Sequence, residues 1–167
     1  MHLPQEDETS MTQHHEVAAQ AGQAPTMAPL IGAWRTEGEV FGEDGRTVVA
    51  AVAGRDVYGE LGPTVVHHVD VEIGGERTRA LEIFEPFDAE RGVFPTRAYD
   101  DRGGVETSTA AVRDGVWTFY AGSASATLQV AEDGASMHAC WEVHEPDGRR
   151  RPWMDLRLTR REPPRSS

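Results

Sequence analysis

The chain has no lysine, and all 16 basic residues among its 167 are arginines. Without a lysine amine, Schiff-base chemistry is excluded. The single cysteine, Cys140, has no partner for an internal disulfide, which is compatible with a reducing cytoplasm. The formal net charge of -12 argues against nucleic acid or an anionic membrane as partner, because both reward a basic surface.

Long apolar runs are also missing. A membrane-spanning helix needs roughly 20 apolar residues, and no stretch of the chain approaches that length. Residues 1–28 lack an apolar segment preceded by positive charge, so no signal peptide is expected. We therefore expect a cytoplasmic protein that binds neither nucleic acid nor membrane, and a homodimer is left open.

Helical periodicity is absent between Trp34 and Arg160. Short segments rich in β-branched residues alternate there with turns made of Gly, Asp and Pro. Several glycines lie within residues 54–63, and they indicate that this segment is a loop or a distorted strand with a bulge. The pattern predicts about ten strands, at residues 30–41, 46–53, 64–73, 77–85, 93–99, 105–112, 116–120, 124–130, 136–144 and 151–159. It favours an all-β fold, a single closed antiparallel up-and-down barrel over residues 29–161.

The two ends of the chain differ from this pattern. Residues 1–28 carry few large apolar side chains and predict a flexible acidic tail, with a helical turn or two at 12–21. His14 and His15 lie in that tail and are expected to be solvated. Residues 27–30 are predicted to close one end of the barrel, and residues 162–167 to form a second flexible end.

Two features carry a resemblance to a known group of folds. Trp34 follows Gly32 at the start of the first strand, and the last strand carries Arg157 and Arg160. In these features the chain resembles the calycin-like small barrels, which include lipocalins, fatty-acid-binding proteins, nitrobindin-type barrels and bacterial domains of unknown function. The resemblance implies a structural pair in which Trp34 packs at a barrel end under Arg157 or Arg160, an arrangement worth roughly 0.5–2 kcal/mol.

The same resemblance bears on cofactors. Nitrobindin-type barrels bind haem through a histidine close to the C-terminus, but the last predicted strand of this chain contains none. His138 and His144 lie on the preceding strand, and either would need an altered haem pose. Pairs such as Gly74-Gly75 are turns without a following helix, so no nucleotide site is implied. We expect no cofactor, with haem binding as an alternative.

His67 is the most prominent candidate for chemistry. It alternates with Val65, Val69 and Val71, so it should point into the barrel, as a ligand, a general base or a core histidine bonded to a neighbouring strand. Tyr99 is a second candidate polar anchor. Aromatic and soft side chains around the strands would either line a pocket or fill the barrel. The predicted ligand-binding residues are His67, Tyr99, Phe84, Trp117, Trp141 and Met154.

One predicted strand presents metal-ligand types on a single face, namely Ser136, His138, Cys140, Glu142 and His144. Residues two apart on a strand are about 6.6–6.8 Å apart, and tight zinc sites usually recruit ligands from another segment as well. The sequence shows no such segment, so no metal site is predicted. A nucleophilic pair of Cys140 and His138 is less favoured, since no helix N-terminus or strained turn would activate the thiol.

Three functions follow from this pattern, and the sequence leaves open whether the chain is an enzyme. The first is a barrel that binds an apolar or aromatic small molecule in its interior. The second is a cofactor-independent enzyme of the cyclase or isomerase type, in which the pocket positions the substrate. The third is a scaffold with a filled barrel. Binding predicts an open cavity, an enzyme also predicts a perturbed histidine or carboxylate inside it, and a scaffold predicts no cavity.

Overall fold

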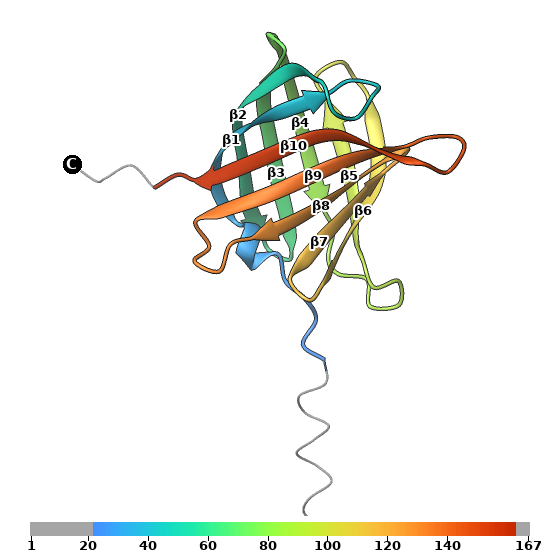
Figure 1. The fold of residues 1–167 in the computed structure, drawn as a ribbon. Helices are drawn as coiled ribbons and strands as arrows, with labels where there is room; N and C mark the ends of the chain where they lie inside the picture. Colours follow the sequence, from blue (N-terminus) through green and yellow to red (C-terminus); the bar gives the residue numbers. More distant parts are fainter. Residues whose placement is uncertain (1–21, 163–167) are drawn as a thin grey trace, which may run out of the picture.

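The computed structural model describes residues 22–162 as ten antiparallel strands closed into one barrel (Figure 1). Each strand pairs with its neighbours in the sequence, and β1 pairs with β10 to complete the ring. The predicted all-β up-and-down barrel is confirmed. Its strands are β1 (Gly32–Phe41), β2 (Val48–Leu61), β3 (Thr64–Ile73), β4 (Glu76–Phe84), β5 (Phe94–Asp100), β6 (Val105–Arg113), β7 (Val116–Ala121), β8 (Ala124–Val130), β9 (Ser136–His144) and β10 (Arg150–Arg160).

Strand β2 differs from the prediction. It runs without a break through residues 54–61, and Tyr58 pairs there with His67 of β3. The predicted loop or distorted strand is therefore wrong. Gly54 is required by a close approach instead, because a Cβ at this position would lie 2.3 Å from the carbonyl oxygen of Asp70. The glycine brings two strand backbones together and does not end the strand.

One end of the barrel is tightly packed. Trp34 and Leu30 are fully buried there, and Phe94, Trp117 and Met137 are nearly so. These side chains come from strands on all sides of the ring and meet in the middle. The short 3-10 helix η1 (Ala28–Leu30) lies against this end, at the bottom of the barrel in Figure 1. The prediction that residues 27–30 close the barrel is confirmed.

An arginine covers Trp34, as the calycin resemblance implied. The guanidinium carbon of Arg160 lies 4.1 Å from the centre of the indole ring. Arg160 Nη1 donates to the carbonyl of Ile31 at 2.7 Å, and Trp34 Nε1 donates to the carbonyl of Leu30 at 2.9 Å. Gly32 makes room for this contact, since a Cβ there would lie 2.3 Å from Arg160 Nη1. Of the two arginines considered, Arg160 is the partner, and Arg157 points outward and is exposed.

The described part of the chain begins at residue 22, inside the segment predicted as a tail. Met27 is 4% exposed and belongs to the core, so the ordered domain begins before residue 29. Residues 1–21 and 163–167 lie outside the described part of the chain. His14, His15 and the helical turn predicted at 12–21 belong to these residues, so the predictions for them stay predictions. Among residues 22–162, no helix is long and apolar enough to span a membrane.

The opposite end of the barrel is less closed. Many interior-facing side chains there, at the ends of β1 and β9 and the start of β10, are half-buried, whereas most at the Trp34 end are buried. The half-buried group includes Leu156, Met154 and Trp141. Val52 and Val71 are exceptions at the open end, since they are 3% and 8% exposed. The interior therefore has a packed half around Trp34 and a half that solvent reaches, which we call the open half.

Candidate functional site

Four polar side chains from four consecutive strands meet inside the barrel. They are Thr36 of β1, Asp56 of β2, His67 of β3 and Glu82 of β4. His67 lies directly opposite Glu82 in the pairing of β3 with β4, and paired residues share a face. Because the barrel is closed, this shared face is its interior. We call these four residues the polar ring.

The polar ring is a continuous chain of hydrogen bonds. His67 Nε2 lies 2.7 Å from Asp56 Oδ1, and His67 Nδ1 lies 2.8 Å from Glu82 Oε2. The hydroxyl of Thr36 donates to the other oxygen of Asp56. Both imidazole nitrogens thus face carboxylates, which only accept hydrogen bonds when ionised. His67 consequently carries a proton on each nitrogen.

Electrostatics favour this doubly protonated form. Burial by itself lowers the pKa of His67, but the charge of Glu82 and the hydrogen bonds to Asp56 and Glu82 outweigh burial and raise the pKa from 6.5 to about 9. His67 is 6% exposed, so bulk water screens these interactions little. A pKa of about 9 keeps the imidazole of His67 protonated at neutral pH.

Aromatic rings hold the imidazole in place. The ring of Tyr58 stacks on His67 with centroids 3.8 Å apart and planes 7° from parallel. Phe84 lies 6.4 Å from His67 and contacts Phe119 of β7 edge-on at 6.1 Å. Burial, with the charges of Asp56 and Glu82, raises the pKa of Tyr58 well above 10, so its hydroxyl stays protonated. A cation stacked on an aromatic face is favourable.

Exposure rises along the polar ring from Thr36 to Glu82. Thr36 is 1% exposed and His67 6%, whereas the side chain of Glu82 is 29% exposed. Glu82 lies opposite Ala98, a half-buried residue of β5 that also faces the open half. The carboxylate of Glu82 is therefore the part of the polar ring that a molecule in the open half would meet.

This arrangement limits what His67 can do. A general base needs a free nitrogen lone pair near neutral pH, and an iron ligand needs one as well. Neither nitrogen of His67 offers a free lone pair, because each carries a proton that it donates to a carboxylate. Of the four histidines within residues 22–162, only His67 faces the interior, because His68, His138 and His144 take outward positions on β3 and β9. The geometry therefore supports His67 as an ordered, charged part of the wall.

The other predicted ligand-binding residues divide into three groups. Phe84 and Trp117 are 1% and 2% exposed and belong to the packed core. Trp141 and Met154 are half-buried neighbours across β9 and β10 and face the open half. Tyr99 lies on the outside of the barrel and is 37% exposed, so it does not share the interior with His67. Whether any of them binds a ligand stays a prediction.

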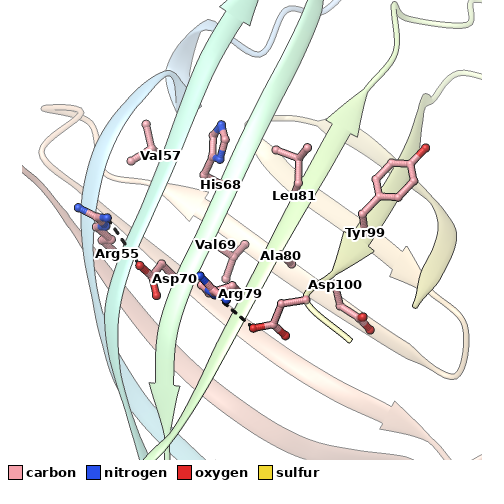
Figure 2. A pocket seen from close by; sticks show the side chains of 11 residues that line it. Arg55, Val57, His68, Val69, Asp70, Arg79, Ala80, Leu81, Tyr99 and Asp100 are labelled. Carbon is pink, nitrogen blue, oxygen red and sulfur yellow. Dashed lines mark hydrogen bonds and ion pairs between the residues drawn. The ribbon is translucent and has the colours of Figure 1, made fainter. Parts of the chain in front are cut away.

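Tyr99 lines a hollow on the outer face (Figure 2). The hollow has a volume of about 610 Å³ and extends over strands β2 to β5. Figure 2 shows Val57, His68 and Leu81 beside it on adjacent strands, with Arg55 close to Asp70 at its edge. Exposed pairs of this kind stabilise little. The hollow is an open surface groove with no enclosed chemistry, and it is separate from the interior.

Sequence reasoning missed three of the four polar-ring residues. Asp56 lay in the segment interpreted as a loop, and Glu82 and Thr36 lay in strands whose inward face was not assigned. Carrying the alternation from His67 across the β3–β4 turn would have found Glu82, because residues equally spaced from that turn are paired. Asp56 needed the uninterrupted β2 strand.

Cys140 and its neighbours lie on the outer face of β9. Partial burial raises the pKa of the Cys140 thiol, and the nearby carboxylates of Asp155 and Glu142 raise it further. A thiol with a raised pKa is a poor nucleophile. His144 does not join Cys140, because its Nε2 bonds the hydroxyl of Ser125 at 2.8 Å. The disfavoured nucleophilic pair thus gains no support.

Comparisons with known proteins bear on the fold. No protein-family model and no curated protein matches the chain. The barrel is similar to the crystal structure of Rv2717c from M. tuberculosis, with a TM-score of 0.58 and 11% identity, covering 81% of this chain and 94% of that one. It is also similar to the S-type phycobiliprotein lyase CPES from Guillardia theta, with a TM-score of 0.51 and 7% identity, covering 81% and 90%. At such low identities the likeness concerns architecture alone, and the chain has a calycin-like barrel fold.

Proposed function

We propose that the chain is a binding protein for a small molecule that enters the open half of the barrel. The observation that carries the proposal is the contrast within one interior. Side chains around Trp34 are fully buried, while Glu82, Trp141 and Met154 face the same interior and remain accessible. The partial exposure of these inward-facing side chains supports access from solvent at that end of the barrel.

The lining of the open half defines the chemistry of the ligand. Phe119, Trp141, Leu156 and Met154 supply apolar and aromatic surface. Glu82 supplies a carboxylate whose one oxygen is held by His67. Small-molecule sites combine such apolar walls with few polar anchors. The ligand we propose has an apolar or aromatic body and a group that donates a hydrogen bond or carries positive charge, placed against Glu82.

This conclusion favours binding over the enzymatic alternative. An enzyme of the isomerase type would use a perturbed residue in the pocket as base or acid. His67 is perturbed, but in the direction that keeps its protons, and both are donated to carboxylates. The polar ring is therefore arranged to hold charge and orient Glu82.

The experiment is native mass spectrometry of the full chain after exposure to a cell extract, with the denatured mass as reference. The proposal expects a stoichiometric extra mass in the folded protein. Ala98→Phe places a ring opposite Glu82 in the open half and should abolish the extra mass. Arg97→Phe adds the same ring one residue earlier, on the exposed outer face, and should leave the extra mass unchanged.

One further variant tests the proposed role of Glu82. Glu82→Gln removes the negative charge at the same size, so it should release the ligand or weaken binding by at least about tenfold, as expected for loss of one charged hydrogen bond. Absence of extra mass across extracts would contradict the proposal, and so would a mass that persists in Ala98→Phe.

A further inference from the structure

A second cluster of reactive side chains lies outside the barrel, on the wall made by β9 and β10. His138 and Cys140 stand two residues apart on the outer face of β9, and Asp155 of β10 is the direct pairing partner of Cys140. The sequence showed metal-ligand types on this strand alone and no second segment. The pairing of β10 with β9 supplies it.

The ligand atoms of these three residues lie close together. His138 Nε2 is 2.8 Å from Asp155 Oδ1, Cys140 Sγ is 3.7 Å from His138 Nε2, and Cys140 Sγ is 3.8 Å from Asp155 Oδ2. A tetrahedral zinc ion with ordinary bond lengths places sulfur, nitrogen and oxygen ligands about 3.3–3.6 Å apart. The two distances from Cys140 Sγ lie within a few tenths of an ångström of such edges, although the contact with Asp155 is to Oδ2. The distance from His138 Nε2 to Asp155 Oδ1 is shorter than an edge by at least about 0.5 Å, so these two side chains have to move apart when both bind one ion.

The surroundings of the cluster suit a cation that arrives from solvent. The side chains of His138 and Asp155 are 46% and 48% exposed, so an ion reaches them without opening the barrel. Glu39 of β1, an exposed residue, pairs with Asp155 on its other side, and Glu142 follows Cys140 on the same face. Arg157, which pairs with His138, offsets part of this negative charge.

We propose that His138, Cys140 and Asp155 form a binding site for a divalent transition-metal ion of the zinc class. Cys140 binds as thiolate, His138 through Nε2 and Asp155 through one carboxylate oxygen, with water at the open fourth position. Binding displaces the thiol proton to solvent and moves the imidazole proton to Nδ1. A thiolate and an imidazole select zinc, cobalt or nickel over magnesium and calcium. This metal site is separate from the barrel interior, and it does not depend on the ligand binding that we propose for the interior.

The strand pairing gives the site its rigidity. All three residues lie on two directly paired strands in the interior of a hydrogen-bonded ladder, so their backbones are fixed before an ion arrives. His138 Nε2 and Asp155 Oδ1 are hydrogen-bonded at 2.8 Å, so only side-chain movement is needed before both atoms bind an ion. Little conformational entropy is then lost on binding, which favours affinity.

The test is titration of the full-length protein with Co²⁺, followed by competition with Zn²⁺. The expected result is one ion per chain and a thiolate-to-cobalt charge-transfer band in the near ultraviolet, which reports the Cys140 sulfur directly. Cys140→Ser should abolish the band. Asp155→Asn should weaken binding by at least about 10–100-fold, the range for loss of even an outer-shell partner.

Two control variants separate this site from other histidines. His144→Gln removes a histidine from the same face of β9 that bonds Ser125, and it should leave binding unchanged. A variant with both His14→Gln and His15→Gln should also bind one ion with the same band. Absence of the charge-transfer band in the wild-type protein would overturn the proposal. Unchanged affinity in Asp155→Asn, or loss of binding in the variant that lacks His14 and His15, would overturn it as well.

Discussion

Replacing His67 by glutamine should change how stability depends on pH. The pKa of His67 is about 9 in the folded protein and near 6.5 when the ring is exposed. Because the folded pKa is the higher one, the stabilisation is complete below about pH 6.5 and is lost as pH rises through about 9. Each pKa unit is worth about 1.4 kcal/mol, so the full contribution is about 3 kcal/mol.

Most of this contribution falls in an accessible window. About 2–3 kcal/mol of it should disappear between about pH 7 and pH 10. Few other groups titrate there, since the chain has no lysine and burial keeps Tyr58 protonated. Cys140 is one of these few, and the same cysteine is present in every variant compared. The window therefore reports mainly on His67.

The assay is urea denaturation of the wild type, His67→Gln and His68→Gln at several pH values. The difference in unfolding free energy between wild type and His67→Gln should shrink by about 2–3 kcal/mol from pH 7 to pH 10. His68→Gln, the outward-facing neighbour, should show a difference that does not change with pH.

A constant or growing difference for His67→Gln would refute the assignment of an imidazolium held by two carboxylates. Should the variant fail to fold, nuclear magnetic resonance of the wild-type imidazole gives the same information. Its titration should have a midpoint near pH 9. A midpoint below 6.5 would mean that burial, and not the carboxylates, governs the ring.

Two further predictions concern the wall and the end of the barrel. Gly54→Ala should destabilise the protein by about 1–3 kcal/mol, because the added Cβ would press on the backbone of β3. Gly59→Ala has open space around it and should change stability by less than about 0.5 kcal/mol. Equal effects of the two variants in urea denaturation would contradict the close approach at Gly54. Arg160→Gln should lower the stability of the protein by about 1–3 kcal/mol, because it removes the contact with the indole of Trp34 and the hydrogen bonds of the guanidinium. Arg157→Gln, at an exposed position, should lower stability much less. A lower melting temperature for Arg157→Gln than for Arg160→Gln would reject Arg160 as the partner of Trp34.

The strands were largely predictable because their signal is local. The bounds of β3, β8 and β9 agree with the alternation and turn residues in the sequence, residue for residue. Gly32 and Trp34 indicated the packed end, and Arg160 was one of two arginines considered. Choosing between Arg157 and Arg160 required the inward or outward phase of β10, which is fixed by its pairing with β1.

The polar sites were harder to predict because they depend on contacts between strands. Asp155 reaches Cys140 only in the observed register, and a bulge between Pro152 and Met154 sets that register. A slip of one residue would turn Asp155 into the barrel. The inward orientation of Asp56 and Glu82 was not predicted for a related reason. A carboxylate on a strand is expected on the solvent-facing side unless a buried partner such as His67 is known.

The closed ring of strands also explains where a ligand has to enter. The polar ring can lie inside an otherwise apolar barrel because His67 compensates two carboxylates that would be costly to bury alone. It rests against the Trp34 end, which η1 and the arginine cover, so that end offers no entrance. A molecule therefore has to come from the opposite side, and it meets the polar ring at Glu82, the most exposed member of that ring. Specificity should accordingly follow the charge of the ligand at this one carboxylate more than the identity of any single aromatic residue in the wall.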